Sequence, residues 1–112
     1  MCFTITTPEK TAKRDIVCYK RLVRRRGQYM SAYQGSFYMF GKVYKTVGFG
    51  FVGRDVFEGR HSYSNLKQAK RLVWDIEVIV KCIIPKGTKY YYNPGDQEYV
   101  SLAIKLVKEL WE

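Results

Sequence analysis

The last third of the chain alternates apolar and polar residues in short runs that are separated by turn residues. The runs cover 75–85 (DIEVIVKCIIP), 88–92 (TKYYY) and 98–110 (EYVSLAIKLVKEL), with PKG and NPGD at the reversals. Alternation with period two is typical of β-strands, and Pro and Gly at these positions favour turns. The pattern predicts consecutive strands of an antiparallel sheet. Leucines four residues apart in the last run also fit a helix, but its β-branched content and the preceding turn favour a strand.

Earlier segments carry the same signal. Residues 15–23 (DIVCYKRLV) alternate as a strand does, RRRG at 24–27 predicts a tight basic loop, and QYMSAY at 28–33 predicts the returning strand. Residues 36–53 are rich in aromatic residues and are interrupted by four glycines, which indicates short strands with bends. Within 88–92, successive side chains point to opposite faces, so Tyr90 and Tyr92 are expected on one face and Tyr91 on the other.

Two segments carry helix signals. In TTPEKTAKR, Thr7 fits an N-cap, Pro8 the first helical position and Glu9 the first turn, which predicts a short N-terminal helix. Ser64 fits the cap of a second helix. The apolar face of that helix is expected to consist of Leu66, Ala69, Leu72 and Val73.

These elements predict one α+β domain over residues 1–112. We expect a mostly antiparallel, curved sheet with one principal amphipathic helix and a short N-terminal helix. A chain of this length buries roughly two thirds of its unfolded surface, which is enough for a modest core.

Several functional classes are disfavoured. No apolar run approaches the roughly 20 residues of a membrane span, and the N-terminal segment lacks the apolar stretch of a secretory signal. The three cysteines form no CxxC pair. Together with the single histidine they are too scattered for a zinc site. We therefore expect a soluble, cytoplasmic protein without a metal or cofactor.

The charge points to an anionic partner. Twenty Lys and Arg residues against ten Asp and Glu residues give a formal net charge of +10. A basic surface attracts anions, although it can also serve solubility alone. The chain has ten tyrosines. Tyrosine rings stack on bases while cations hold phosphate, so nucleotide binding is expected. The alternative is that the tyrosines simply suit a β-sheet with one solvent-exposed face.

Catalysis is less expected. There is no GxxxxGK loop, no GxGxxG after a strand and no HExxH. His61 with Glu58 is a possible acid–base pair, but a histidine at a strand-to-helix junction more often bonds the backbone of a turn. Cys18 and Cys82 lie in apolar strand patterns, where buried and inert thiols are usual.

The candidate ligand-binding residues come from the basic clusters and from the tyrosines beside them. They are Arg24, Arg25, Arg60, His61, Tyr63, Lys67, Arg71, Lys86, Lys89 and Tyr91.

The motifs "TPEK…DIVCYK", "GRHSY" and "IPKGTKYY" resemble those of small proteins of gut-type bacteria and their phages, over about residues 2 to 107. The resemblance implies a host and a gene neighbourhood, not a mechanism. Arg60 departs from it, because an apolar residue is expected before the histidine. A more distant likeness to ADP-ribosyltransferase folds implies NAD as a substrate and Glu98 as an essential residue, although the chain is short for that fold.

We therefore expect a non-enzymatic, phage-type or mobile-element protein that binds an anionic nucleotide. Such a protein can act as a host-defence antagonist by sequestering a nucleotide immune signal. The alternatives are a module that binds nucleic acid or inhibits an acidic host protein, and a small NAD-using enzyme. The oligomeric state is left open.

Overall fold

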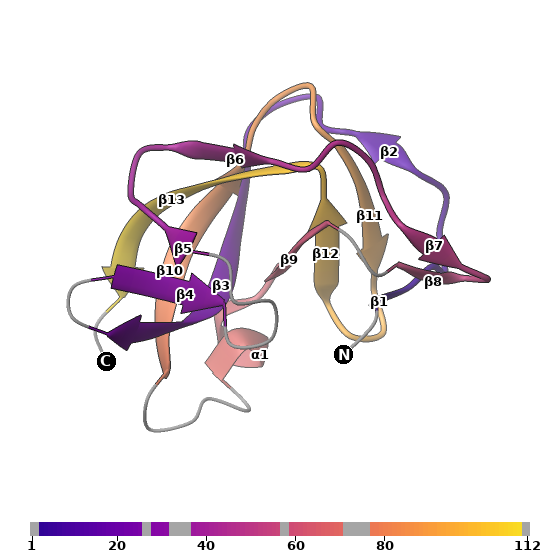
Figure 1. The fold of residues 1–112 in the computed structure, drawn as a ribbon. Helices are drawn as coiled ribbons and strands as arrows, with labels where there is room; N and C mark the ends of the chain where they lie inside the picture. The colour runs from indigo at the N-terminus through magenta and orange to yellow at the C-terminus, as the bar shows by residue number, and fades with distance from the viewer. Residues whose placement is uncertain (1–2, 26–27, 32–36, 57–58, 71–76, 111–112) are drawn as a thin grey trace.

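The described part of the chain consists mainly of β-strands (Figure 1). The computed structural model describes residues 3–25, 28–31, 37–56, 59–70 and 77–110; for Arg25, Ser31, Phe37 and Val52 it describes the backbone alone. The strands are β1 (Phe3–Thr4), β2 (Lys10–Thr11), β3 (Ile16–Arg25), β4 (Gln28–Ser31), β5 (Phe37–Tyr38), β6 (Val43–Lys45), β7 (Phe51–Val52), β8 (Asp55–Val56), β9 (Arg60–Tyr63), β10 (Glu77–Ile84), β11 (Lys89–Asn93), β12 (Glu98–Ser101) and β13 (Ala103–Leu110). Helix α1 covers Leu66–Lys70.

The main sheet has the strand order β2-β11-β12-β9-β3-β10-β13-β6, and β4 and β5 extend it from β3. Strands β12 and β13 are separated by Leu102 alone, yet β12 pairs with β9 and β11 whereas β13 pairs with β10 and β6. The bend at Leu102 therefore passes the chain from one half of the sheet to the other, and the strands curve around a shared interior (Figure 1). A small second sheet has the order β1-β8-β7.

The central pair β3 and β10 supplies much of the core. Val80, Cys82 and Ile84 alternate along β10 and are fully buried, and Cys18 and Leu22 of β3 are buried against them. Cys82 lies directly opposite Cys18 in the register. The alternation in the sequence thus gives each strand one buried face, because strand side chains point alternately to the two faces.

The α+β class expected from the sequence is wrong: the structure is a mostly antiparallel β-sheet protein, and α1, with five residues, is the single helix within the described ranges. The N-terminal helix is not formed. Lys10 and Thr11 instead pair with Tyr90 and Lys89 of β11. A helix of one or two turns is marginal in water, so pairing with a sheet edge outcompetes it.

The prediction of a principal amphipathic helix is also wrong. The cap of α1 is Asn65, whose side-chain oxygen accepts the amides of Lys67 (2.7 Å) and Gln68 (3.3 Å). Ser64 instead donates its hydroxyl to the Gln97 carbonyl. Of the expected apolar face, Ala69 is buried, whereas Leu72 and Val73 lie outside the described residues.

The strand predictions agree better with the structure. Residues 16–25 and 28–31 form the β3–β4 hairpin, and the last run forms β12 and β13 rather than a helix. The rings of Tyr90 and Tyr92 both contact Tyr99, whereas Tyr91 contacts Phe49, so the two faces of the tyrosine run are as predicted. No helix in the described ranges is long and apolar enough to cross a membrane.

Candidate ligand-binding site

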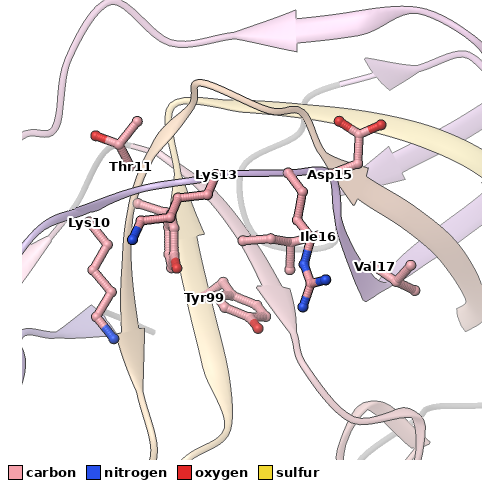
Figure 2. Close-up of a pocket in the computed structure, with 9 residues that line it drawn as sticks. Lys10, Thr11, Lys13, Asp15, Ile16, Val17 and Tyr99 are labelled. Carbon is pink, nitrogen blue, oxygen red and sulfur yellow. The ribbon is translucent and has the colours of Figure 1, made fainter.

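An open hollow of about 980 Å³ lies between the segment 10–17 and the tyrosine face of β11 and β12 (Figure 2). We call it the tyrosine hollow. It is lined by Lys10, Thr11, Lys13, Arg14, Asp15, Ile16, Val17, Tyr90 and Tyr99. The volume is that of a site for a small organic ligand, since such sites measure roughly 300–1,000 Å³.

Three cationic side chains border the tyrosine hollow. Lys10, Lys13 and Arg14 are all exposed, and Asp15 is the one acid among the described lining residues. The Asp15 carboxylate accepts a hydrogen bond from the Lys86 backbone amide (2.8 Å), and this bond partly compensates its negative charge. Among the lining residues that the structure describes, three cations and one acid give a formal charge of +2. The site therefore attracts anions.

Tyrosine rings form the base of the tyrosine hollow. Tyr90 and Tyr99 meet edge to face, with ring centroids 5.7 Å apart. Tyr92 lies directly opposite Tyr99 in the register and continues the row, with a centroid distance of 4.8 Å. Burial, with a smaller contribution from the nearby Tyr92 hydroxyl, raises the pKa of the Tyr99 hydroxyl to about 12. Tyr99 is therefore a neutral hydrogen-bond donor beside an apolar ring.

Backbone hydrogen bonds fix the segment that carries the cations. The Ala12 amide donates to the Thr88 carbonyl (2.9 Å), and the Gly87 amide donates to the Ala12 carbonyl (2.8 Å). Together with the bond from Lys86 to Asp15, they attach the segment to the turn at 85–88 on both sides of Lys13. Binding to a site that is ordered in advance avoids much of the entropy cost of ordering a loop.

None of the eight candidates whose side chains the structure describes lines the tyrosine hollow. Arg24 lies at the end of the β3–β4 hairpin, where both Glu109 carboxylate oxygens accept its guanidinium at 3.0 and 2.9 Å. Arg60 donates to the Tyr38 hydroxyl (3.2 Å) and to the Lys45 carbonyl (3.0 Å). The side chain of Arg25 and the whole of Arg71 lie outside the described residues.

His61, Tyr63 and Tyr91 belong to the other face of the sheet. His61 is opposite Val100, and Val100 is opposite Tyr91, whereas Tyr99 is opposite Ser62. Directly opposed residues share a face and successive residues alternate, so a ligand in the tyrosine hollow does not reach these three side chains.

His61 lies within β9 rather than in a turn. Its Nδ1 is 4.0 Å from a carboxylate oxygen of Glu98, while Glu58 is outside the described residues. Tyr63 accepts a hydrogen bond from Arg21 (2.7 Å). The structure thus brings His61 and Glu98 together, on the face away from the tyrosine hollow.

The three candidate lysines are exposed at separate places. Lys67 is on α1, Lys86 is at the turn that supports the segment 10–17, and Lys89 of β11 is opposite Thr11. Lys89 is therefore the candidate nearest in register to the lining of the tyrosine hollow.

The cysteines have buried environments. Burial raises the pKa of the Cys18 thiol to about 11, and burial likewise raises the pKa of the Cys82 thiol. Both thiols are thus protonated at neutral pH and poor nucleophiles. The described residues hold no group of three or more His, Cys, Asp or Glu side chains arranged to bind a metal ion.

Comparison of the chain with protein-family models, with curated proteins and with solved structures finds no match.

Proposed function

We propose that the protein binds an anionic ligand of the nucleotide class in the tyrosine hollow, without a chemical step. The observation that carries the proposal is the meeting of three cationic side chains with two tyrosine rings in one space of ligand size. Cations provide charge-assisted hydrogen bonds to phosphate. Tyrosine rings provide stacking worth about 1–3 kcal/mol per base.

The biological role that fits such binding is sequestration. A small protein that holds a nucleotide without converting it lowers the free concentration of that nucleotide. In a phage-type or mobile-element protein, the nucleotide would be an immune signal of the host. This role rests on the resemblance of the sequence motifs and on ligand binding, and the first experiment therefore concerns binding.

A thermal-shift panel at physiological salt tests the proposal. The probes are ATP, ADP-ribose, NAD, a cyclic dinucleotide and short single- and double-stranded DNA and RNA. A ligand at 100 times its dissociation constant adds about 2.7 kcal/mol of stability, which raises the Tm of a domain of this size by roughly 10 °C. We expect such a shift with at least one of the small nucleotides.

A matched pair of charge reversals assigns the shift to the site. Lys13→Glu removes a cation from the lining of the tyrosine hollow, whereas Lys108→Glu makes the same change at an exposed position of β13 that does not line it. We expect the shift to disappear in the first variant and to persist in the second. An equal loss of the ligand-induced thermal shift in both variants would mean that the ligand is attracted nonspecifically to the basic surface.

Binding to nucleic-acid polymers alone would contradict the proposal. A polymer that contacts about five cations shows a slope of log affinity against log salt near −4 to −5, whereas a small ligand with a few phosphates shows a shallower slope. The salt dependence thus separates the two kinds of ligand in the same assay.

A further inference from the structure

We propose that the outer face of strands β6, β10 and β13 binds an acidic segment of another protein, in which carboxylates alternate with apolar side chains. This surface is separate from the tyrosine hollow, and the proposal does not depend on nucleotide binding. We call it the lysine face. It consists of Val43, Lys45, Lys81, Ile83, Lys105 and Lys108.

The strand register places these residues on one side of the sheet. Ile83 is directly opposite Lys105, and Lys105 is directly opposite Val43. Directly opposed residues share a face, and so do residues two positions apart in one strand, which adds Lys81 and Lys45. The alternate residues of β10 and β13 are buried in the core. The lysine face is therefore the side of the sheet that points away from the core.

A β-bulge places two lysines side by side. The register of β10 with β13 shifts between Lys81 and Cys82, so that Lys81 is opposite Lys108 whereas Cys82 is opposite Leu106. The extra residue is Val107, and both Val107 and Lys108 are exposed. Like charges that are directly opposed destabilise a strand pair. A carboxylate from a partner that lies between the two ammonium groups would remove this repulsion.

The strands that carry the lysine face do not neutralise it themselves. Within the described ranges, none of its four lysines forms an ion pair with a carboxylate. Glu109 is opposite Val80, on the core side, and pairs with Arg24. Glu77 is at the other end of β10, opposite Val23. The positive charge of the lysine face is therefore available to an anionic partner.

The side chains between the lysines favour a protein partner over a nucleic acid. Val43 is 39% exposed, and Val107 beside the lysine face is 40% exposed. Strands β10 and β13 contain no aromatic residue, and Tyr44 of β6 packs against the core. Single-stranded nucleic acids bind where bases stack on aromatic rings. A protein segment with both carboxylates and apolar side chains instead matches the lysines and covers the valines.

Fluorescence anisotropy at physiological salt tests the proposal with three labelled probes. They are a short peptide of alternating Glu and Leu, an oligoglutamate with the same number of carboxylates, and an oligothymidylate with the same number of phosphates. We expect the Glu–Leu peptide to bind about tenfold or more tightly than the other two probes. It alone buries apolar surface against Val43 and Ile83.

Charge reversals locate the binding of the Glu–Leu peptide. Lys105→Glu, at the centre of the lysine face, is expected to weaken it about tenfold or more, because like charges repel across an interface. Lys108→Glu, at a more exposed position, is expected to act in the same direction. Lys10→Glu is the control, since Lys10 lines the tyrosine hollow on β2, at the opposite end of the strand order from β6. It should change the affinity by less than about twofold.

A conservative variant tests the apolar part of the lysine face. Val43→Thr keeps the β-branched shape that suits a strand. It is expected to weaken binding of the Glu–Leu peptide about threefold, because a hydroxyl replaces a methyl group that the peptide covers. Binding of the oligoglutamate should stay the same.

Three results would overturn the proposal. If the oligothymidylate binds as tightly as the Glu–Leu peptide, the lysine face is a surface for anionic polymers in general. If Lys10→Glu weakens the peptide as much as Lys105→Glu and Lys108→Glu do, the peptide responds only to the net charge of the molecule. If the peptide does not bind at millimolar concentration, the lysines serve solubility alone.

Discussion

Asp15 gives the sharpest test at the level of single residues. Its charge opposes anion binding, but its carboxylate also holds the segment with Lys13 and Arg14 to the Lys86 amide (2.8 Å). We predict that Asp15→Ala, which removes both the charge and the hydrogen-bond acceptor, weakens ADP binding about three- to tenfold, because the cost of a less ordered segment outweighs the repulsion that the change removes. Calorimetric titration measures the affinity.

Electrostatics alone predicts the opposite sign for this variant, because the Coulomb energy with an anion improves when an acid is lost. Asp55→Ala is the control, since Asp55 accepts a hydrogen bond from Thr4 (2.9 Å) and does not line the tyrosine hollow. Tighter binding by Asp15→Ala would show that Asp15 is only a local negative charge and not a positioning residue.

Gly59 is a residue that the fold requires for steric reasons. Its φ is +139°, and a Cβ atom built there would lie 2.5 Å from Val100 Cγ2. Val100 is fully buried, so it has little room to move. We predict that Gly59→Ala lowers the free energy of unfolding by about 2 kcal/mol or more, combining backbone strain with overpacking. Urea unfolding measures the loss.

Gly48→Ala is the matched control, because nothing lies within 4 Å of a Cβ atom at Gly48 and its φ is not positive. Its effect is expected within about 0.5 kcal/mol. If Gly59→Ala also changed the free energy of unfolding by no more than about 0.5 kcal/mol, that result would contradict the close approach of Gly59 to Val100.

The residues of the tyrosine hollow were only partly predictable from sequence. The cationic residues Lys10, Lys13 and Arg14 are visible in the sequence, but a predicted helix hid their relation to Tyr90 and Tyr99. Only the pairing of β2 with β11, between positions about 80 residues apart, brings them together. The basic clusters that do stand out in sequence are used elsewhere, as in the pairing of Arg24 with Glu109.

At the level of elements, α1 depends on its cap. Asn65 accepts two backbone amides at the start of a helix of five residues. We predict that Asn65→Ala lowers the free energy of unfolding by about 1 kcal/mol, the usual effect of losing such a cap. Lys67→Ala, an exposed position of the same helix, is expected to change it by less than about 0.5 kcal/mol. Equal effects would mean that the cap contributes no specific stability.

Strands were more predictable than helices in this chain. Period-two alternation is a property of each strand by itself, so the sequence indicates β3, β10 and β13 and the two faces of the tyrosine run. The helix signals were local too, but a helix of one or two turns has little stability of its own. Thr7, expected as a cap, donates instead to the Tyr92 carbonyl (2.7 Å), a contact made by the sheet.

The bend at Leu102 is the feature that the pattern did not predict. Alternation continues through residues 98–110 with nothing to mark a change of partners, because strand pairing depends on distant segments. That bend separates the tyrosine-bearing half of the sheet from the β10–β13 half. The overall architecture therefore was not accessible from the pattern of a single segment.

At the level of the whole molecule, the buried tyrosine hydroxyl and cysteine thiol groups predict how the free energy of unfolding changes at alkaline pH. Burial raises the pKa of Tyr99 from 10.0 to about 12, so the folded protein keeps a proton that the unfolded chain releases near pH 10. The stability from this group is complete below pH 10 and is lost as the pH rises through about 12. Cys18 acts likewise between pH 9 and about 11, since burial raises its pKa.

We therefore predict that the urea midpoint is constant from about pH 7 to 8.5 and falls between pH 9 and 12. Tyr99→Phe keeps the ring and removes its ionisation, so the fall between pH 10 and 12 should be shallower in this variant. Parallel curves for the two proteins would contradict the buried setting of the Tyr99 hydroxyl.

Titration of the ¹⁵N-labelled protein with ADP, followed by backbone amide chemical shifts, tests the central claim most directly. The account predicts saturable shifts in the segment 10–17 and at Tyr90 and Tyr99, with small changes at the β3–β4 hairpin and α1. Shifts confined to the hairpin, α1 or the His61 face would place the ligand elsewhere, and the absence of shifts at millimolar ADP would contradict nucleotide binding itself.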